Sequence, residues 1–246
     1  FRVPSRDELA ERLDAVLQAI YAAFTEGWAD PAGADATRRD LAEEALFLAR
    51  LVAELLPSEA EALGLLALIL HAEARRKARR DASGDFVPLA GQDRAQWDWN
   101  RIEEAECTLR QASALGAVGR FQLEAAIQSV HVARCHTGRA SWAELILLYD
   151  GLIELTGSPV AMLNRTLAIA EVEGAKAGLS ELERLAASGR LNEYQPFWAA
   201  RAELLMRAGR GAEAQAAYEL AIGLESDPAV RRFLQKKQDS AGRLAV

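Results

Sequence analysis

Apolar residues in the first half of the chain recur three or four positions apart, the spacing of one face of an α-helix. One such stripe runs from Leu9 to Phe24, and a second runs from Leu41 to Leu55. In the segment 58–70, leucine, isoleucine and alanine leave almost no polar face. We therefore predict two amphipathic helices followed by a helix that is buried on all sides at the centre of the core.

Capping patterns predict where several helices begin. A serine followed three residues later by glutamate is typical of a capping box, and the pairs are Ser5 with Glu8, Ser58 with Glu61 and Ser141 with Glu144. Ser158-Pro159 and Asp227-Pro228 each place a capping residue before a proline at the first helical position. The later helices are predicted at 95–114, 120–137, 141–156, 159–173, 175–188, 195–208, 211–223 and 228–238.

The segment 81–94 is the long irregular stretch of the first half, because glycine, proline and aspartate punctuate it. A loop of this length within a compact domain is commonly functional or mobile. No segment alternates apolar and polar residues in the way a half-buried strand does, so we predict no strands.

The second half of the chain contains an internal repeat. Four pairs of like residues lie 69 residues apart, namely Tyr149/Tyr218, Ile153/Ile222, Leu155/Leu224 and Pro159/Pro228, with Ala133/Ala202 upstream. This is twice the tetratricopeptide period of about 34 residues. The last unit carries the small and large residues of that repeat at Trp198, Ala202, Gly209, Ala214, Tyr218 and Ala221, and Leu182 takes the matching place in the unit between.

The expected fold is thus all-α, a right-handed array of antiparallel helical hairpins that is tetratricopeptide-like especially in the C-terminal half. Generic alanine-rich hairpins are the alternative. We divide the chain into an N-terminal helical subdomain, 1–114, with its long loop at 81–94, and tetratricopeptide-like hairpins, 115–246, within what is expected to be one continuous domain.

Composition narrows the functional classes. The chain has 246 residues, of which 50% are hydrophobic and 26% are charged, and its net charge is −7. These values are typical of a globular protein and argue against a free-standing nucleic-acid binder. The two cysteines, Cys107 and Cys135, form no disulfide scaffold, which favours the cytoplasm. Because the chain begins with Phe1, we expect it to be part of a longer polypeptide.

Motifs of enzymes and cofactor sites are absent from the sequence, so we predict no catalytic activity, no cofactor and no metal. One alternative is a metal site in which His131, Cys135 and His136 are joined by Cys107 from a neighbouring helix. Another is an enzyme with a buried polar site among Glu73, Arg76, Asp93 and His71.

A basic run, Arg75 to Arg80, follows the buried third helix. Cations near a helix C-terminus interact favourably with the helix dipole, and this is the simpler interpretation. The alternative is a site for an anion or an acidic partner, built with Glu73, the 81–94 loop and Trp97.

Several blocks of the sequence resemble a known family. They read FRVPSRDELAERLDAVLQAIYAAFTEGW at the start, ALILHAEARRKAR and then DFVPLAGQDRAQWD in the middle, and SPVAMLNRTLAIAEVEG and GRGAEAQAAYELAI in the second half. Together they resemble the C-terminal extension found in one group of extracytoplasmic-function RNA polymerase sigma factors. The likeness extends over essentially the whole chain, and the middle blocks are its most specific part.

The resemblance implies a bacterial, cytoplasmic transcription factor whose promoter-binding regions precede Phe1. This chain would regulate transcription initiation in cis, contacting those regions and RNA polymerase, with an acidic protein or a small-molecule effector as a possible further partner. DNA would be bound only through the regions outside the chain, and no membrane would be involved. The residues that match the family blocks form the expected interaction or ligand site: Glu73, Arg75, Arg76, Arg79, Gln92, Asp93, Arg94, Trp97, Asn164 and Arg165.

On this hypothesis, loss of Arg75 and Arg76 changes regulation without unfolding the domain. The competing hypothesis is a stand-alone tetratricopeptide-like scaffold that binds a peptide or a small anionic ligand.

Overall fold

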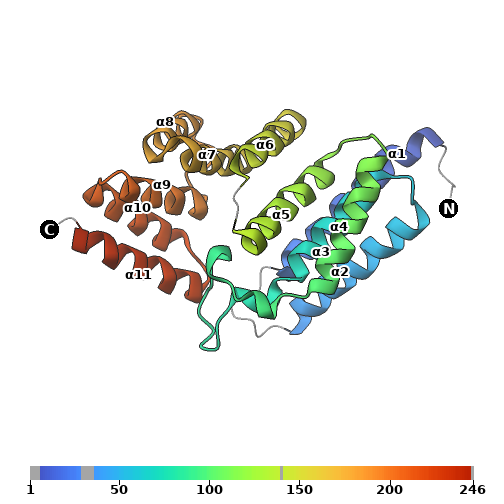
Figure 1. Cartoon of the computed structure of the whole chain (residues 1–246), viewed down its shortest axis with the longest axis horizontal. Helices are drawn as coiled ribbons and strands as arrows, with labels where there is room; N and C mark the ends of the chain where they lie inside the picture. The colour runs from blue at the N-terminus through green and yellow to red at the C-terminus, as the bar shows by residue number, and fades with distance from the viewer. Residues whose placement is uncertain (1–5, 29–35, 139–140, 245–246) are drawn as a thin grey trace. The chain divides into compact units, whose positions relative to one another are not determined.

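The structure is a computed structural model, which describes residues 6–28, 36–138 and 141–244. The regular elements in these ranges are helical (Figure 1), so the predicted all-α class is confirmed. The α-helices are α1 (Arg6–Trp28), α2 (Ala36–Leu55), α3 (Ala60–Glu73), α4 (Trp99–Ala114), α5 (Arg120–Thr137), α6 (Trp142–Thr156), α7 (Pro159–Glu173), α8 (Ala175–Ala186), α9 (Gln195–Arg207), α10 (Gly211–Leu224) and α11 (Pro228–Leu244). Three short 3₁₀ turns lie between α3 and α4: η1 (Arg76–Arg79), η2 (Leu89–Gly91) and η3 (Arg94–Gln96).

Most helix boundaries lie within two residues of those predicted from the sequence. The helix predicted from residue 95 is an exception, because α4 begins at Trp99 after the turn η3. Asp98 is its N-cap, and the Asp98 carboxylate accepts a hydrogen bond from the Arg101 amide at 3.1 Å. The α11 helix continues to Leu244, six residues beyond its predicted end.

The capping predictions have mixed outcomes. Ser158 and Asp227 cap α7 and α11 as expected, by accepting from the amides of Ala161 at 3.3 Å and Ala229 at 2.8 Å. The box predicted at Ser58 is wrong, because α3 begins at Ala60 after Glu59. Ser141 precedes α6 but makes no side-chain capping bond there. Ser5, the first residue of the predicted box with Glu8, lies outside the described residues.

Glu61 has a different role from the one predicted. Its carboxylate oxygens accept hydrogen bonds from the backbone amides of Phe121, at 2.9 Å, and Gln122, at 3.0 Å. The first amides of a helix have no partner within that helix. Glu61 of α3 therefore caps the start of α5, a helix 60 residues away in the sequence.

The chain forms two compact units. Unit 1 contains the described residues of 1–77 and 95–129, and unit 2 contains those of 78–94 and 130–246. The division falls within α5, whereas the sequence suggested 114/115. The irregular segment 78–94 belongs to unit 2, although it lies between two helices of unit 1 in the sequence.

Unit 1 is built around α3, which is buried on all sides as predicted. Leu65, Ile69 and Leu70 have no measurable exposure, and α1, α2 and α4 contribute further apolar side chains to the same core. Gly64 lets α3 approach the start of α5 closely, since a Cβ built there would lie 2.6 Å from the backbone nitrogen of Gln122.

Unit 2 contains consecutive helical hairpins. In Figure 1 the helices from α6 to α11 follow one another, and each packs on the next in sequence. Short connections force neighbouring helices to run antiparallel. This hairpin packing is the repeat arrangement predicted for the C-terminal half.

The repeat positions can be compared residue by residue. Tyr149 and Tyr218 are both buried, and Leu182 is fully buried in the unit between them. Ala202 is fully buried, whereas its predicted counterpart Ala133 is exposed. The repeat therefore holds for the aromatic position but not at its upstream end.

No helix in the described part of the chain is long and apolar enough to cross a membrane.

Candidate functional site

The predicted site residues of unit 1 centre on a buried carboxylate, Glu73. Its side chain is 7% exposed, and both of its oxygens accept from Nε of Arg76 at 3.0 Å. Arg101 of α4 adds a longer ion pair at 3.7 Å. The Arg76 guanidinium also lies over the Trp28 ring, 4.8 Å from its centroid. The structure brings Glu73 and Arg76 together as partners in an internal ion pair.

Arg75 bonds to its own unit in the same way. Its Nε donates to the backbone oxygen of His71 at 3.1 Å, and an Nη atom donates to the Gln128 side chain. His71 is fully buried, and burial, with the Arg75 cation as a smaller cause, lowers the pKa of His71 to about 3. The imidazole is therefore neutral at pH 7, so its 3.5 Å approach to Glu106 is not an interaction between charges.

Trp97 is buried at 4% exposure and packs beside Trp99, with ring centroids 5.7 Å apart. The Asp98 amide donates to the backbone oxygen of Ala74 at 2.9 Å. The Asp98–Ala74 bond joins the start of α4 to the end of α3. Trp97 therefore has a packing role within unit 1.

The segment 78–94 of unit 2 is fastened to α11. Arg80 bonds Asp227 at 2.6 Å, and Asp85 accepts from Arg232 and Lys236 at 2.8 Å each. The Phe86 ring meets Phe233 edge to face, with centroids 5.5 Å apart. We name this set of contacts, which joins residues 80–86 to Asp227 and to α11, the loop clasp.

The remaining predicted residues of this segment are spread along it. Arg94 donates to the backbone oxygens of Cys135, at 2.7 Å, and His136, at 3.3 Å, near the C-terminal end of α5. A cation that bonds the last carbonyls of a helix stabilises its end. The Gln92 side chain donates to the backbone oxygen of Val87 at 3.4 Å. The Val87 amide in turn donates to the backbone oxygen of Arg79 at 2.8 Å. Asp93 is exposed.

Three arginines of the basic run are thus tied into the protein's own structure. Arg75 and Arg76 bond within unit 1, and Arg80 bonds within unit 2. An ion pair that is already formed offers little net charge to a partner. These bonds give Arg75, Arg76 and Arg80 a structural role, which differs from both the helix-dipole interpretation and the partner-site interpretation of the run.

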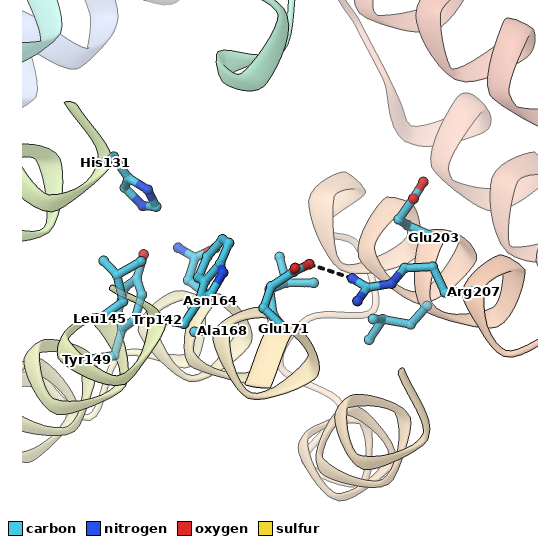
Figure 2. Close-up of a pocket in the computed structure, with 11 residues that line it drawn as sticks. His131, Trp142, Leu145, Tyr149, Asn164, Ala168, Glu171, Glu203 and Arg207 are labelled. Atoms are coloured by element: carbon cyan, nitrogen blue, oxygen red, sulfur yellow. Dashed lines mark hydrogen bonds and ion pairs between the residues drawn. The ribbon is translucent and has the colours of Figure 1, made fainter. Parts of the chain in front are cut away.

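A groove in unit 2 is a candidate binding site. It has a volume of about 300 Å³, at the lower limit of small-ligand pockets. Figure 2 shows the side chains that surround it. The lining residues are His131 of α5; Trp142, Leu145 and Tyr149 of α6; Asn164, Leu167, Ala168 and Glu171 of α7; and Glu203, Leu204 and Arg207 of α9.

The groove combines an apolar floor with a polar rim. Leu145, Ala168 and Leu204 are buried, and burial raises the pKa of Tyr149 to about 12, so its hydroxyl remains protonated. At the rim, Arg207 bonds Glu171 at 2.5 Å, the dashed line in Figure 2. An apolar surface with a few fixed polar groups is typical of a recognition site.

Asn164 is the one predicted site residue that lines this groove. The next residue, Arg165, pairs with Asp150 of α6 at 2.5 Å and is not among the lining residues. Sequence reasoning missed the pair Glu171–Arg207, although a signal existed. The two residues are 36 positions apart, which is close to the repeat period. Glu171 and Arg207 therefore occupy similar places on α7 and α9, each the first helix of its hairpin.

The two alternatives considered for the sequence can be compared with the described residues. Among the described residues there is no group of three or more histidine, cysteine, aspartate or glutamate side chains that could hold a metal ion. The groove is lined by none of Glu73, Arg76, Asp93 and His71, the residues of the suggested enzyme site.

Comparisons with known proteins give relatives without an assigned activity. Residues 12–113 match the model of a family of unknown function, DUF6596. The chain is 36% identical over 239 residues to an uncharacterized protein of Rhizobium meliloti (strain 1021). The match covers 97% of this chain and 56% of that relative, so the chain spans little more than half of the relative's length. No solved structure matches the chain.

Proposed function

We propose that this chain is the regulatory protein-interaction region of a bacterial RNA polymerase sigma factor of the extracytoplasmic-function class. In this proposal it acts in the cytoplasm, where it controls transcription initiation by contacting the promoter-binding regions of the same polypeptide and RNA polymerase. It has no catalytic step. DNA is contacted only by the promoter-binding regions, which lie outside this sequence.

The groove of unit 2 is the structural observation that supports the proposal. Arrays of helical hairpins bind extended segments across successive repeats. The Asn164 amide can both donate and accept, as a peptide backbone requires. The buried floor, which includes Leu145 and Leu204, would accept an apolar side chain next to that backbone.

The sequence and the relative support the regulatory role. The resemblance to sigma-factor extensions covers essentially the whole chain. The Rhizobium meliloti relative is 56% covered, so 44% of its length lies outside the match. That remainder would accommodate promoter-binding regions in a protein of the same organisation.

The sequence suggested loss of Arg75 and Arg76 as the test of regulation, but the ion pair of Arg76 makes that test ambiguous. Arg76 is the main partner of the buried Glu73 carboxylate, so replacing Arg76 would leave a buried charge poorly compensated. Loss of regulation in an Arg76 variant could then reflect unfolding of unit 1. A variant within the groove avoids this difficulty.

Asn164→Ala in the full-length protein is the better test. No bond of the Asn164 side chain holds the described structure together, so the fold should be retained. Gln235→Ala is the matched control, because it removes an exposed amide from α11 of the same unit, away from the groove. Transcripts are profiled after induction of each variant, and RNA polymerase that copurifies with it is quantified.

The wild-type protein and Gln235→Ala should copurify with RNA polymerase and change the same set of transcripts. Asn164→Ala should copurify with the polymerase but alter the size of that transcriptional response. If the wild-type protein neither associates with RNA polymerase nor changes any transcript, the sigma-factor proposal is wrong. If Asn164→Ala matches the control, regulation does not use this groove.

The groove is also compatible with a second function, a stand-alone scaffold for a peptide or a small anionic ligand. The two functions differ in the length of the native polypeptide. An immunoblot of the source cells with antibody to this region would give a band well above the mass of the chain for the sigma factor. A band at the mass of the chain would favour the scaffold.

A further inference from the structure

The helix α2 of unit 1 carries an exposed apolar stripe. Phe47, Leu51 and Leu55 are 58%, 39% and 69% exposed. Their four-residue spacing places them on one face of the helix over about two turns. Large apolar side chains gathered on a surface typically mark an interaction site.

The other face of α2 is already buried in the core of unit 1. That face is formed by small residues, Ala42, Ala45, Ala49 and Ala53, none more than 5% exposed. At about 100° per residue, Leu51 lies on the opposite side of the helix from Ala42. The stripe therefore takes no part in the core, on the face where a surface helix ordinarily presents polar residues.

Acidic side chains border the stripe. Asp40, Glu43 and Glu44 precede Phe47 on the helix, and Glu54 lies beside Leu55, all of them exposed. The one basic residue within the stripe's length, Arg50, is held in a two-pronged ion pair with Glu104 of α4. Between residues 40 and 55 the border of the stripe is therefore negative, and the exposed Arg39 lies just before it.

We infer that this face of α2 is a docking surface for an amphipathic helix of a partner protein, apolar on one side and lined by lysine or arginine along its edges. The apolar sides would bury one another, and the basic edges would meet the carboxylates. A second copy of α2 fits poorly, since it would bring its own acidic residues against these. The inference goes beyond the proposed function, because it concerns a different surface and does not depend on transcription.

Binding of synthetic helices to purified full-length protein tests the inference by fluorescence anisotropy. The probe is a labelled amphipathic peptide with leucine at every fourth position and lysine or arginine on both edges. A second peptide keeps the leucines and carries glutamate on the edges. The basic peptide should bind, and the acidic peptide should bind at least about tenfold more weakly.

Variants locate the binding. Leu51→Glu and, separately, Phe47→Gln should each weaken the basic peptide by about tenfold or more and leave the circular dichroism melting curve unchanged, since both side chains are exposed. Leu147→Glu is the matched control, because Leu147 is a 71% exposed leucine on α6 in unit 2. That variant should bind like the wild type.

Three results would overturn the inference: no binding of the basic peptide, equal binding of both peptides, or full binding by Leu51→Glu and Phe47→Gln. A fourth such result would come from sedimentation of the same samples, which measures whether the protein is a monomer or a dimer. A dimer that Leu51→Glu dissociates would assign the stripe to a second copy of the chain instead of a partner helix.

Discussion

Replacing Gly64 by alanine should destabilise unit 1, although alanine is the better helix former. Gly64 lies within α3, where its Cα faces the start of α5. A Cβ there would lie 2.6 Å from the backbone nitrogen of Gln122, 2.9 Å from its Cα and 3.0 Å from the carbonyl carbon of Phe121. All three atoms are backbone, so no side chain can rotate to make room.

The magnitude follows from two opposing effects. Forcing extra atoms into a packed core costs about 1–3 kcal/mol, and a clash with backbone belongs at the upper end of that range. Alanine recovers about 1 kcal/mol of helix propensity relative to glycine. The free energy of unfolding should therefore fall by about 2 kcal/mol, which for a chain of this size lowers the melting temperature by about 4–8 °C.

Gly223→Ala is the control, because Gly223 is also a helical glycine, near the end of α10, and a Cβ there would meet nothing within 4 Å. This variant should keep or slightly raise the melting temperature. Thermal unfolding followed by circular dichroism compares the two, and hydrogen exchange should increase in α3 and α5 for Gly64→Ala alone. A Gly64→Ala protein that melts at or above the wild-type temperature would refute the close approach of the two helices.

Three further changes have defined outcomes. Arg76→Ala should lower the free energy of unfolding by about 1–3 kcal/mol, because the buried Glu73 carboxylate loses its main partner. Adding Glu73→Gln removes the buried charge and should recover part of that loss. Urea titrations measure both changes. Burial holds the pKa of His71 at about 3 in the folded state, whereas the unfolded imidazole titrates near 6.5. As the pH falls below about 6.5, His71 takes up a proton in the unfolded state but not in the folded state, so the folded state loses stability. His71→Leu should remove this loss, about 2 kcal/mol at pH 5, in melts recorded at pH 7 and pH 5. Hydrogen bonds from Lys236 and Arg232 lower the pKa of Asp85, so the loop clasp is intact above about pH 4 and weakens as the pH falls further. Asp85→Asn should reproduce that loosening at pH 7 as faster hydrogen exchange in residues 81–86, whereas unchanged exchange would contradict the role of these bonds.

The sequence by itself determined which segments are helices and where most of them begin and end. The range of α5 matches the prediction at both ends, and Ser158 and Asp227 cap the helices that their patterns indicated. These features depend on residues a few positions apart, because helical periodicity and capping are local. The buried state of α3 was predictable for the same reason, since a short segment without a polar face has to lie in a core.

Only the tertiary structure decided which residues meet across the chain. The basic run suggested a site for an acidic partner, but Arg80 bonds Asp227, which lies 147 residues further along. The Glu61 carboxylate caps α5 instead of its own helix. Asn164 and Arg165 are adjacent in sequence, yet only Asn164 lines the groove. Long-range partners depend on how whole helices pack. A local pattern identifies the residue type, but it does not predict which distant group that residue will contact.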